Sequence, residues 1–453
     1  MPRSVTSGGS TRRNFMATSA VAFAGTALVG ATPTAVHAGG GDTLKIALVG
    51  CGSRGAGAAV QALCTKGSVK LWAMADAFSA PLERCLTNLQ RGLEASYDRA
   101  ATAGLGDRID VPKERRFVGL DAYRHAIDSG VDVVILTEPP GFRPRHLRYA
   151  VAADKHVFME KPVATDVVGV HRVLEAAELA KQKGLKIGVG LQRRHQTSYL
   201  EGVSRIHDGE IGQLVLMRCY WNGGMPAKTP TPRGDSTELE HQVRNWYFYT
   251  WLSGDHICEQ HVHNLDVCNW VKQEHPIEAK GVGGRQVRTG KEYGNIFDHH
   301  AVEFTYADGT KLFSQCRQIP GCDSRVAESL HGTRSIADFI GPRATFKTNG
   351  KIIWRSGRPA PGVNPYQTEH DALFDAIRNS QPHNEAEYGA HSTMTAILGR
   401  MATYSGKAVT WDAAFQSAQK LTTDAETWDA EPPILPNSDG SYPVAIPGRT
   451  KIV

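Results

Sequence analysis

Gly50, Gly52 and Gly55 have the type and spacing of a turn that binds the phosphates of a dinucleotide. The first glycine makes a tight turn, the second lets the backbone approach a pyrophosphate, and the third lets a helix pack on a strand. An apolar run at 45–49 precedes the turn and small residues at 56–63 follow it, which indicates the required strand and helix. The alternative is a tight turn that binds nothing. The predicted contacts are Gly50, Cys51, Gly52, Ser53, Arg54 and Gly55.

An acidic residue, Asp76, ends the next predicted strand, about 20 residues after the turn. Its carboxylate would bind the ribose 2′-hydroxyl of NAD and repel the 2′-phosphate of NADP. Arg54 leaves NADP open, because a guanidinium in the turn could bind that phosphate. The sequence therefore favours NAD as the cofactor.

The elements around the turn alternate between strand and helix. Buried strands are expected at 45–49, 69–75, 131–136, 156–159 and 186–190, with helices at 78–105, after Pro144 and at 165–184. This alternation predicts an α/β fold with a doubly wound parallel sheet, assigned to a first domain at 42–162.

The second half of the chain has strands of a different kind. The segments 214–220, 277–282, 300–306, 311–318 and 334–339 alternate between polar and apolar residues. They predict an α+β domain at 163–430, with a large, open and mainly antiparallel sheet covered by helices on one face. A helical segment at 366–402 can fold back onto the first domain. The tail at 431–453 is expected to be extended, across the surface or on a partner subunit.

A third motif, Glu160-Lys161-Pro162, completes a recognisable order of residues. The glycine turn, Asp76, Thr137-Glu138-Pro139-Pro140, His146 and the segment KHVFMEKP follow one another, and SGKAVTWD comes late in the chain. This order resembles the Gfo/Idh/MocA family of glucose–fructose oxidoreductase, inositol dehydrogenase and rhizopine-catabolism dehydrogenases. The resemblance covers residues 43–412. It implies a Rossmann domain for the cofactor and a second domain for the substrate.

The resemblance also implies catalytic roles. Lys161 would lie between nicotinamide and substrate, polarise the reacting oxygen and pass its proton; the alternative is a salt bridge to Glu160 or another neighbour. His263 would take the hydroxyl proton as hydride leaves for the nicotinamide. On a helix, Glu259, His263 and Asp266 would lie on one face. Glu259 would orient His263 or bind a sugar hydroxyl, and Asp266 would bind an adjacent hydroxyl. The family commonly has Asp where Glu259 stands, which leaves the substrate geometry open.

Other residues are assigned by their place in the motifs. On one helical face, His256, Glu259 and His263 also form a plausible zinc or manganese set, and this metal alternative stays open beside the prediction of no metal. Aromatic residues at 246–251 suit a sugar ring or an ordinary core. The further predicted cofactor contacts are Thr137, Glu138, Pro139, His146, Glu160, Lys161 and Gln192. The further predicted substrate contacts are Arg194, His195, Trp246 and Asp298.

The predicted activity is hydride transfer between NAD and a secondary alcohol of a sugar, sugar derivative or cyclitol. One alternative is an NAD-dependent glycosidase, which oxidises a sugar transiently, eliminates a substituent and reduces the sugar again. Another is a sugar-binding protein without catalysis, which the presence of both Lys161 and His263 disfavours. The family resemblance also implies a homo-oligomer, a dimer or tetramer, that buries the free face of the open sheet.

The N-terminus predicts export. Thr11-Arg12-Arg13-Asn14-Phe15-Met16 resembles the twin-arginine signature, an apolar segment follows at 17–29, and Val36-His37-Ala38 offers a cleavage site. A disordered tail is the alternative. We therefore expect a signal peptide at 1–38, a twin-arginine translocase as a transient partner, and a periplasmic or otherwise exported protein. Because free nicotinamide cofactor is not expected there, the protein would retain its NAD.

Charge and cysteine content exclude other classes. Residues 1–38 hold three arginines and no acid, so the formal net charge of +5 becomes +2 without them. No basic stripe with interleaved aromatics is present, which argues against nucleic-acid binding, and no membrane contact is expected after the signal is removed. None of the eight cysteines forms a CxxC pair, so a structural zinc site is not expected. Pairing of Cys316 with Cys322 stays open.

Overall fold

The computed structural model describes residues 43–92, 105–226, 228–357 and 363–452. The predicted signal peptide at 1–38 lies outside these residues, as does most of the second half of the helix expected at 78–105. None of the helices in the described ranges has the length and apolar character that a membrane span requires.

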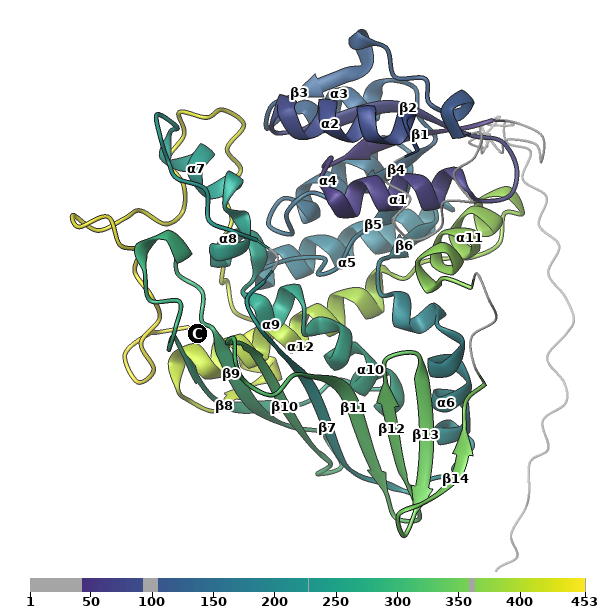
Figure 1. Ribbon diagram of the computed structural model, residues 1–453, viewed down its shortest axis with the longest axis vertical. Coiled ribbons are helices and arrows are strands. Elements are labelled where there is room, and N and C mark those ends of the chain that lie inside the picture. The colour runs from purple at the N-terminus through teal and green to yellow at the C-terminus, as the bar shows by residue number, and fades with distance from the viewer. Residues whose placement is uncertain (1–42, 93–104, 227, 358–362, 453) are drawn as a thin grey trace, which may run out of the picture. The chain divides into compact units, whose positions relative to one another are not determined.

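The first sheet is parallel, with six strands in the order β3-β2-β1-β4-β5-β6 (Figure 1). Its strands are β1 (Leu44–Val49), β2 (Val69–Asp76), β3 (Arg116–Val118), β4 (Val133–Leu136), β5 (His156–Met159) and β6 (Ile187–Val189). The helices that follow them are α1 (Ser53–Leu63), α2 (Ser79–Gln90), α3 (Ala122–Asp128), α4 (Arg143–Ala152) and α5 (Val167–Gln182). Short 3₁₀ turns lie at Leu105–Arg108 and Lys113–Arg115.

The strand order confirms the doubly wound prediction. From β1 the chain proceeds to β2 and β3 on one side, and later to β4, β5 and β6 on the other. The loops after β1 and β4 therefore diverge and leave a crevice at the carboxyl ends of the strands, where ligands of such sheets bind. The sheet extends past residue 162, where the sequence placed the end of the first domain, because β6 pairs with β5.

The second sheet has nine strands in the order β14-β13-β12-β11-β7-β10-β9-β8-β15. All neighbours are antiparallel except β7 and β10, so the prediction of a mainly antiparallel sheet is confirmed. The strands are β7 (Leu214–Gly223), β8 (Glu278–Gly284), β9 (His299–Thr305), β10 (Lys311–Gln318), β11 (Arg325–Gly332), β12 (Ile336–Ile340), β13 (Arg343–Thr348), β14 (Lys351–Arg355) and β15 (Val409–Thr410). The sequence did not predict β11, because the buried Glu328 interrupts its apolar pattern.

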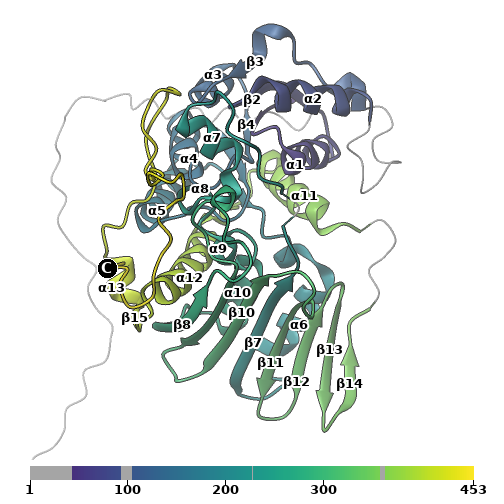
Figure 2. The ribbon, with the colours of Figure 1, turned by 60° about the vertical axis from the view of Figure 1, so that its left-hand side comes forward.

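Helices cover one face of this sheet, and the other face carries no helix of the described chain (Figures 1 and 2). The covering helices include α6 (Thr197–His207), α9 (His256–Glu259), α10 (Val262–Lys272) and α12 (Ala386–Ser405). Smaller helices are α7 (Glu238–Arg244), α8 (Thr250–Ser253) and α13 (Trp411–Phe415), with 3₁₀ turns at Gln192–His195, Trp246–Phe248 and Lys291–Tyr293.

The helical segment expected at 366–402 is two helices, α11 (Pro365–Arg378) and α12. From α11, Leu373 and Phe374 pack in one core cluster with Leu48 of β1 and Phe158 of β5. This segment thus returns to the first sheet after the chain has built the second one. Burial of these apolar side chains is what holds α11 there.

The tail after Glu431 has no helix or strand up to residue 452. It packs on its own chain: the Tyr442 hydroxyl donates to Glu238 of α7, and Gln242 donates to the Ile434 carbonyl. Figure 2 shows it as an extended yellow coil that passes beside α7 and α8. Cys316 is buried and Cys322 exposed, and both are free thiols.

Candidate active site

A cavity of about 850 Å³ opens at the carboxyl ends of the parallel strands and extends to the turn between α9 and α10. It brings together residues that are far apart in the sequence. From the first sheet it is lined by Gly50, Gly52, Ser53, Arg54, Gly55, Asp76, Thr137, Glu138, Pro139, His146, Glu160 and Lys161. From the rest of the chain it is lined by Trp221, Lys228, Trp246, Glu259, Gln260, His263 and Tyr366, among others.

The three glycines of the turn meet different constraints. Gly50 has φ 91°, and a Cβ there would lie 2.5 Å from the backbone nitrogen of Glu138. A Cβ on Gly55 would lie 2.1 Å from the Gly50 carbonyl oxygen, so this residue allows the helix to approach the strand. A Cβ on Gly52 would meet no atom within 4 Å, which leaves its backbone open toward a ligand. Cys51 is buried behind the turn and does not line the cavity.

Asp76 is held in place at the end of β2. Its carboxylate accepts the backbone N–H of Cys51 at 2.7 Å and that of Phe78 at 2.9 Å. Burial raises the pKa of Asp76, although these hydrogen bonds and the nearby Arg84 act in the opposite direction. A carboxylate fixed at this strand end fits the ribose hydroxyl of NAD, as the sequence predicted.

Arg54 is directed to another part of the cavity. Its Nε lies 2.8 Å from Glu160 Oε1, its Nη2 donates to Gln61, and its guanidinium lies 5.0 Å from the Tyr366 ring centroid. Glu160 follows β5, which β1 and β4 separate from β2 and Asp76. Arg54 therefore gives no support for a 2′-phosphate site.

Lys161 is paired with Glu259 across the cavity. Its Nζ donates to the Glu259 backbone carbonyl at 2.5 Å and to Glu259 Oε1 at 3.1 Å. The two side chains are only 15% and 14% exposed, so water screens this pair weakly. The alternative partner Glu160 instead binds Arg54. The ammonium group is thus held at a defined position in the cavity wall.

His263 lies beside this pair. Its ring stacks on Trp221 with centroids 5.9 Å apart, and its Nδ1 is buried without a hydrogen bond. Burial lowers the pKa of His263 well below its ordinary value, and the positive charges of Lys161 and Arg193 lower it further. His263 is therefore neutral near pH 7, the state in which an imidazole accepts a proton.

The sequence placed Glu259, His263 and Asp266 on one helical face, and this prediction is wrong. Helix α9 ends at Glu259 and α10 begins at Val262, so a turn separates the first of these residues from the other two. Glu259 consequently contacts Lys161, and none of its described polar contacts is to His263.

Several predicted substrate contacts do not line the cavity. Asp266 is 1% exposed and accepts hydrogen bonds from Arg194 Nε at 2.9 Å, Arg194 Nη2 at 2.8 Å and Ser392 Oγ at 2.8 Å. His195 binds Glu385 at 3.0 Å. These side chains satisfy one another inside the protein, which leaves no group of theirs in the cavity wall.

Of the remaining predicted contacts, some line the cavity and others do not. Asp298 accepts backbone N–H groups from residues 286–288 and is fully buried away from the cavity, and Gln192 does not line it either. Trp246 does line it. On the opposite wall His146 Nδ1 lies 3.2 Å from Glu138 Oε1, and burial lowers the pKa of His146.

Some cavity residues were missed by sequence reasoning. Trp221 lies near the end of β7, and its indole lines the cavity next to His263. Lys228 lies 5.1 Å from the Trp246 ring centroid; burial lowers its pKa, while the charges of Glu259 and Asp76 raise it. Trp221 directly follows the strand predicted at 214–220, and an aromatic residue in this position is a signal by which the sequence could have identified it. Lys228 lies in a Pro-rich and Gly-rich loop that gave no signal.

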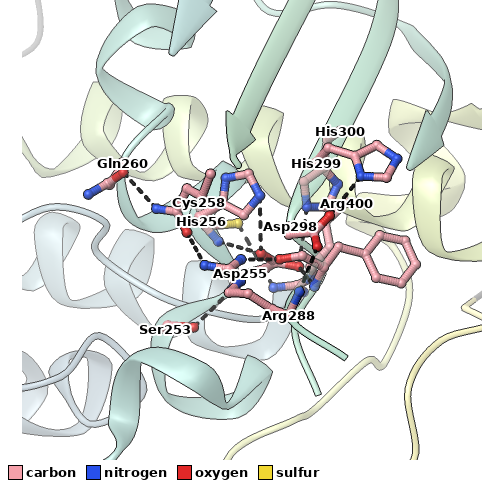
Figure 3. Close-up of polar contacts among 12 residues, drawn as sticks. Ser253, Asp255, His256, Cys258, Gln260, Arg288, Asp298, His299, His300 and Arg400 are labelled. Atoms are coloured by element: carbon pink, nitrogen blue, oxygen red, sulfur yellow. Dashed lines mark hydrogen bonds and ion pairs between the residues drawn. The ribbon is translucent and has the colours of Figure 1, made fainter. Parts of the chain in front are cut away.

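The alternative metal set of His256, Glu259 and His263 does not come together. His256 instead lies with Asp255 and His300 in a fully buried cluster, the one group of possible metal ligands found in the described ranges (Figure 3). The Asp255 carboxylate already accepts hydrogen bonds from the His256 N–H, the Phe297 N–H and the Tyr404 hydroxyl.

Charge also opposes a divalent cation in this buried cluster. His300 Nε2 lies 3.2 Å from Asp255 Oδ2, and the guanidinium groups of Arg288 and Arg400 lie near by (Figure 3). A single carboxylate with two guanidinium groups in the same buried region leaves little negative charge for a metal ion. We interpret the cluster as the support of α9, which Asp255 begins with φ 70°.

Comparisons with known proteins find similarity to NAD-binding oxidoreductases. Residues 44–191 match the family model described as "Oxidoreductase family, NAD-binding Rossmann fold". Inositol 2-dehydrogenase of Acidiphilium cryptum is 26% identical over 46% of this chain and 56% of its own length. Inositol 2-dehydrogenase of Klebsiella pneumoniae (strain 342) is 24% identical over 70% of this chain and 87% of its own length. The chain spans little more than half the length of the first curated relatives it matches.

Solved structures share the fold. Aldose-aldose oxidoreductase from Caulobacter crescentus has a TM-score of 0.63 at 16% identity, covering 82% of this chain and 100% of that one. Levoglucosan dehydrogenase in complex with NADH and levoglucosan has a TM-score of 0.61 at 15% identity, covering 82% and 99%. Residues 44–191 thus match the NAD-binding Rossmann fold of this oxidoreductase family, in agreement with the resemblance that the sequence motifs indicate for this part of the chain.

The glycine geometry separates folding from cofactor binding. Gly52→Ala adds a methyl group to open space, so it should leave the melting temperature unchanged and weaken NADH binding by at least about tenfold. Gly50→Ala places a Cβ at positive φ against Glu138, so it should lower the free energy of unfolding by about 1–2 kcal/mol or more. Urea denaturation and NADH fluorescence titration measure both. Normal NADH affinity of Gly52→Ala would contradict the assignment.

Proposed function

We propose that the protein is an NAD-dependent oxidoreductase that transfers hydride between its cofactor and a secondary alcohol of a sugar, sugar derivative or cyclitol. The observation that carries the proposal is the meeting of Lys161, Glu259 and His263 in the same cavity as the glycine turn. The similarity to inositol dehydrogenases and to sugar oxidoreductases supports the substrate class.

Different residues of the chain have different roles in this reaction. NAD held by the glycine turn and Asp76 would supply the acceptor or donor of the hydride. Lys161, oriented by Glu259, donates a hydrogen bond to the reacting oxygen and polarises it. Neutral His263 takes the hydroxyl proton, and because its Nδ1 is buried, Nε2 is the atom that receives it. Trp221 and Trp246 provide apolar walls for the C–H faces of a sugar ring.

Turnover of the cofactor-loaded protein tests this function. Sugars and cyclitols are added one at a time while the absorbance of bound NADH is followed. Lys161→Ala should reduce the rate on an active substrate by about 10²–10⁴-fold, because it removes an acid–base group, and should leave NADH binding nearly intact. The exposed Lys66→Ala is the matched control.

The glycosidase alternative has a different signature in the same assay. Release of an aglycone from a glycoside, with no accumulation of oxidised product and no net NADH, would favour it. Full activity of Lys161→Ala on an oxidised sugar would contradict the proposed mechanism. Absence of any redox change with all sugars and cyclitols would contradict the proposed function itself.

We further propose that the protein is exported through the twin-arginine route and retains its NAD. The basis for export is the sequence at 11–38, which lies outside the described residues. Lys228 is a feature that favours retention. It reaches the cavity from the loop after β7 and carries a positive charge between Asp76 at the ribose end and Glu259 at the reacting end. The diphosphate of a dinucleotide lies between these two ends.

Lys228→Ala should therefore release NADH faster. Loss of a charge-assisted hydrogen bond corresponds to about a tenfold or larger rise in the dissociation rate, which stopped-flow fluorescence measures. Lys66→Ala again serves as control. Mass spectrometry of protein from the periplasm of an expression host checks bound dinucleotide and cleavage after Ala38 together. An unchanged dissociation rate would show that Lys228 has no part in retention.

We also propose that the uncovered face of the nine-stranded sheet binds a second copy of the chain. Val282, Phe313 and Ile340 on this sheet are 71%, 43% and 56% exposed. Charged side chains between them are paired with each other, as in Lys311–Glu303 at 3.0 Å and Lys347–Asp338 at 2.9 Å. A largely neutral face with apolar groups suits self-association about a twofold axis.

Phe313→Glu should convert the oligomer to a monomer without loss of folding, because it puts a charge into the interface on an exposed strand position. Light scattering after size-exclusion chromatography measures the mass. Exposed Leu435→Glu on the tail is the control. A wild-type protein that is monomeric at micromolar concentration would overturn this proposal.

A further inference from the structure

We propose that Gln260 is a specificity-determining residue that donates hydrogen bonds from its side-chain amide to an oxygen of the substrate next to the reacting alcohol. Gln260 follows Glu259, the partner of Lys161, and precedes His263, and all four side chains line the cavity. The inference rests on the proposed function. It adds the chemical feature by which the cavity would recognise its substrate.

The guanidinium group of Arg288 can only donate hydrogen bonds. Arg288 is 1% exposed, and its guanidinium donates to Gln318 Oε1 and to the Phe297 carbonyl. Because the guanidinium has no acceptor atom, the atom of the Gln318 amide that faces it must be the oxygen. This fixes the orientation of the Gln318 amide, which atomic positions alone leave open to a flip.

The orientation of the Gln318 amide in turn determines the orientation of the Gln260 amide. Gln318 Nε2, on the side away from Arg288, donates to the Tyr247 hydroxyl at 2.5 Å and to Gln260 Oε1 at 2.9 Å. Gln260 must therefore present its oxygen to Gln318. Its amide nitrogen is left, with two N–H groups and no acceptor among the described residues.

The support of this amide chain is rigid. Gln318 is 2% exposed, and its backbone N–H donates to the Asp298 carbonyl. Asp298 in turn accepts the backbone N–H of Arg288, and Phe297 donates to Asp255 at the start of α9 (Figure 3). Since buried hydrogen bonds at both ends hold the Gln318 amide, Gln260 cannot turn its oxygen into the cavity without losing one of them.

The polar groups around the reacting position define the substrate that fits. Lys161 and Gln260 donate, and Glu259 accepts. A ring with a second oxygen beside the reacting alcohol would satisfy Gln260, whereas an analogue that lacks this oxygen would leave a desolvated donor unpaired. Such an unpaired donor discriminates more strongly than a missing apolar contact does.

The test uses Gln260→Leu with a series of monodeoxy analogues of the most active sugar or cyclitol. On the parent substrate kcat/KM should fall about tenfold, corresponding to one lost hydrogen bond. On the analogue that lacks the partner oxygen, the variant should have a kcat/KM equal to or higher than that of the wild type, because only the wild type leaves a donor unpaired. NADH affinity should stay unchanged, and the melting temperature should fall by a few degrees at most, because the buried Gln318 amide loses one of its acceptors. Gln182→Leu, an exposed substitution on α5, is the control.

Gln260→Glu keeps the size of the side chain and the oxygen that accepts from Gln318, but it replaces the donor group by a carboxylate oxygen, so kcat/KM on the parent substrate should fall at least as far as in Gln260→Leu. An equal loss of kcat/KM on every analogue, or no loss on the parent, would overturn the inference. In either case wild-type turnover would leave the proposed function intact. Absence of turnover by the wild type with every sugar and cyclitol would instead overturn the proposed function.

Discussion

The contact between Lys161 and Glu259 is the constraint on which the site depends. It joins the end of β5 in the first sheet to the end of α9 beside the second sheet, residues 98 positions apart. Both charges are mostly removed from water, so each is stable there only while the other is present. The pair thereby requires the two sheets to be placed so that the cavity has both a cofactor wall and a substrate wall.

Desolvation governs the other titratable groups of the cavity. Burial raises the pKa of Asp76 and lowers the pKa of His263 and of His146, in each case by disfavouring the charged form. The buried network around Asp255 supplies the rigid base, because it holds the start of α9 and the amide chain that ends at Gln260. The cavity thus combines two ion pairs, Lys161–Glu259 and Arg54–Glu160, with a neutral imidazole at His263 that can accept a proton.

The sequence predicted the residues on the cofactor side of the cavity better than those on the substrate side. The glycine turn, Asp76 and Lys161 lie at strand ends of a parallel sheet, and the order of the motifs is enough to bring such ends together. On the substrate side, the helix is interrupted between Glu259 and Val262, which a periodicity of 3.6 residues does not reveal. Asp266 and Arg194 had suitable chemistry, but they neutralise each other inside the protein.

The sequence by itself determined the local features: the phosphate-binding turn, the alternation that makes a parallel sheet, and the residue types able to exchange protons. Each of these features depends on residues a few positions apart in the sequence, because it follows from the local backbone conformation and from the periodicity of side chains along a helix or strand. Only the tertiary structure decided which side chains pair with one another. Glu259 binds Lys161 rather than His263, Arg54 binds Glu160 rather than lying at Asp76, and Gln318 orients Gln260. A buried polar group must find a partner, and which one it finds depends on what distant segments bring within reach.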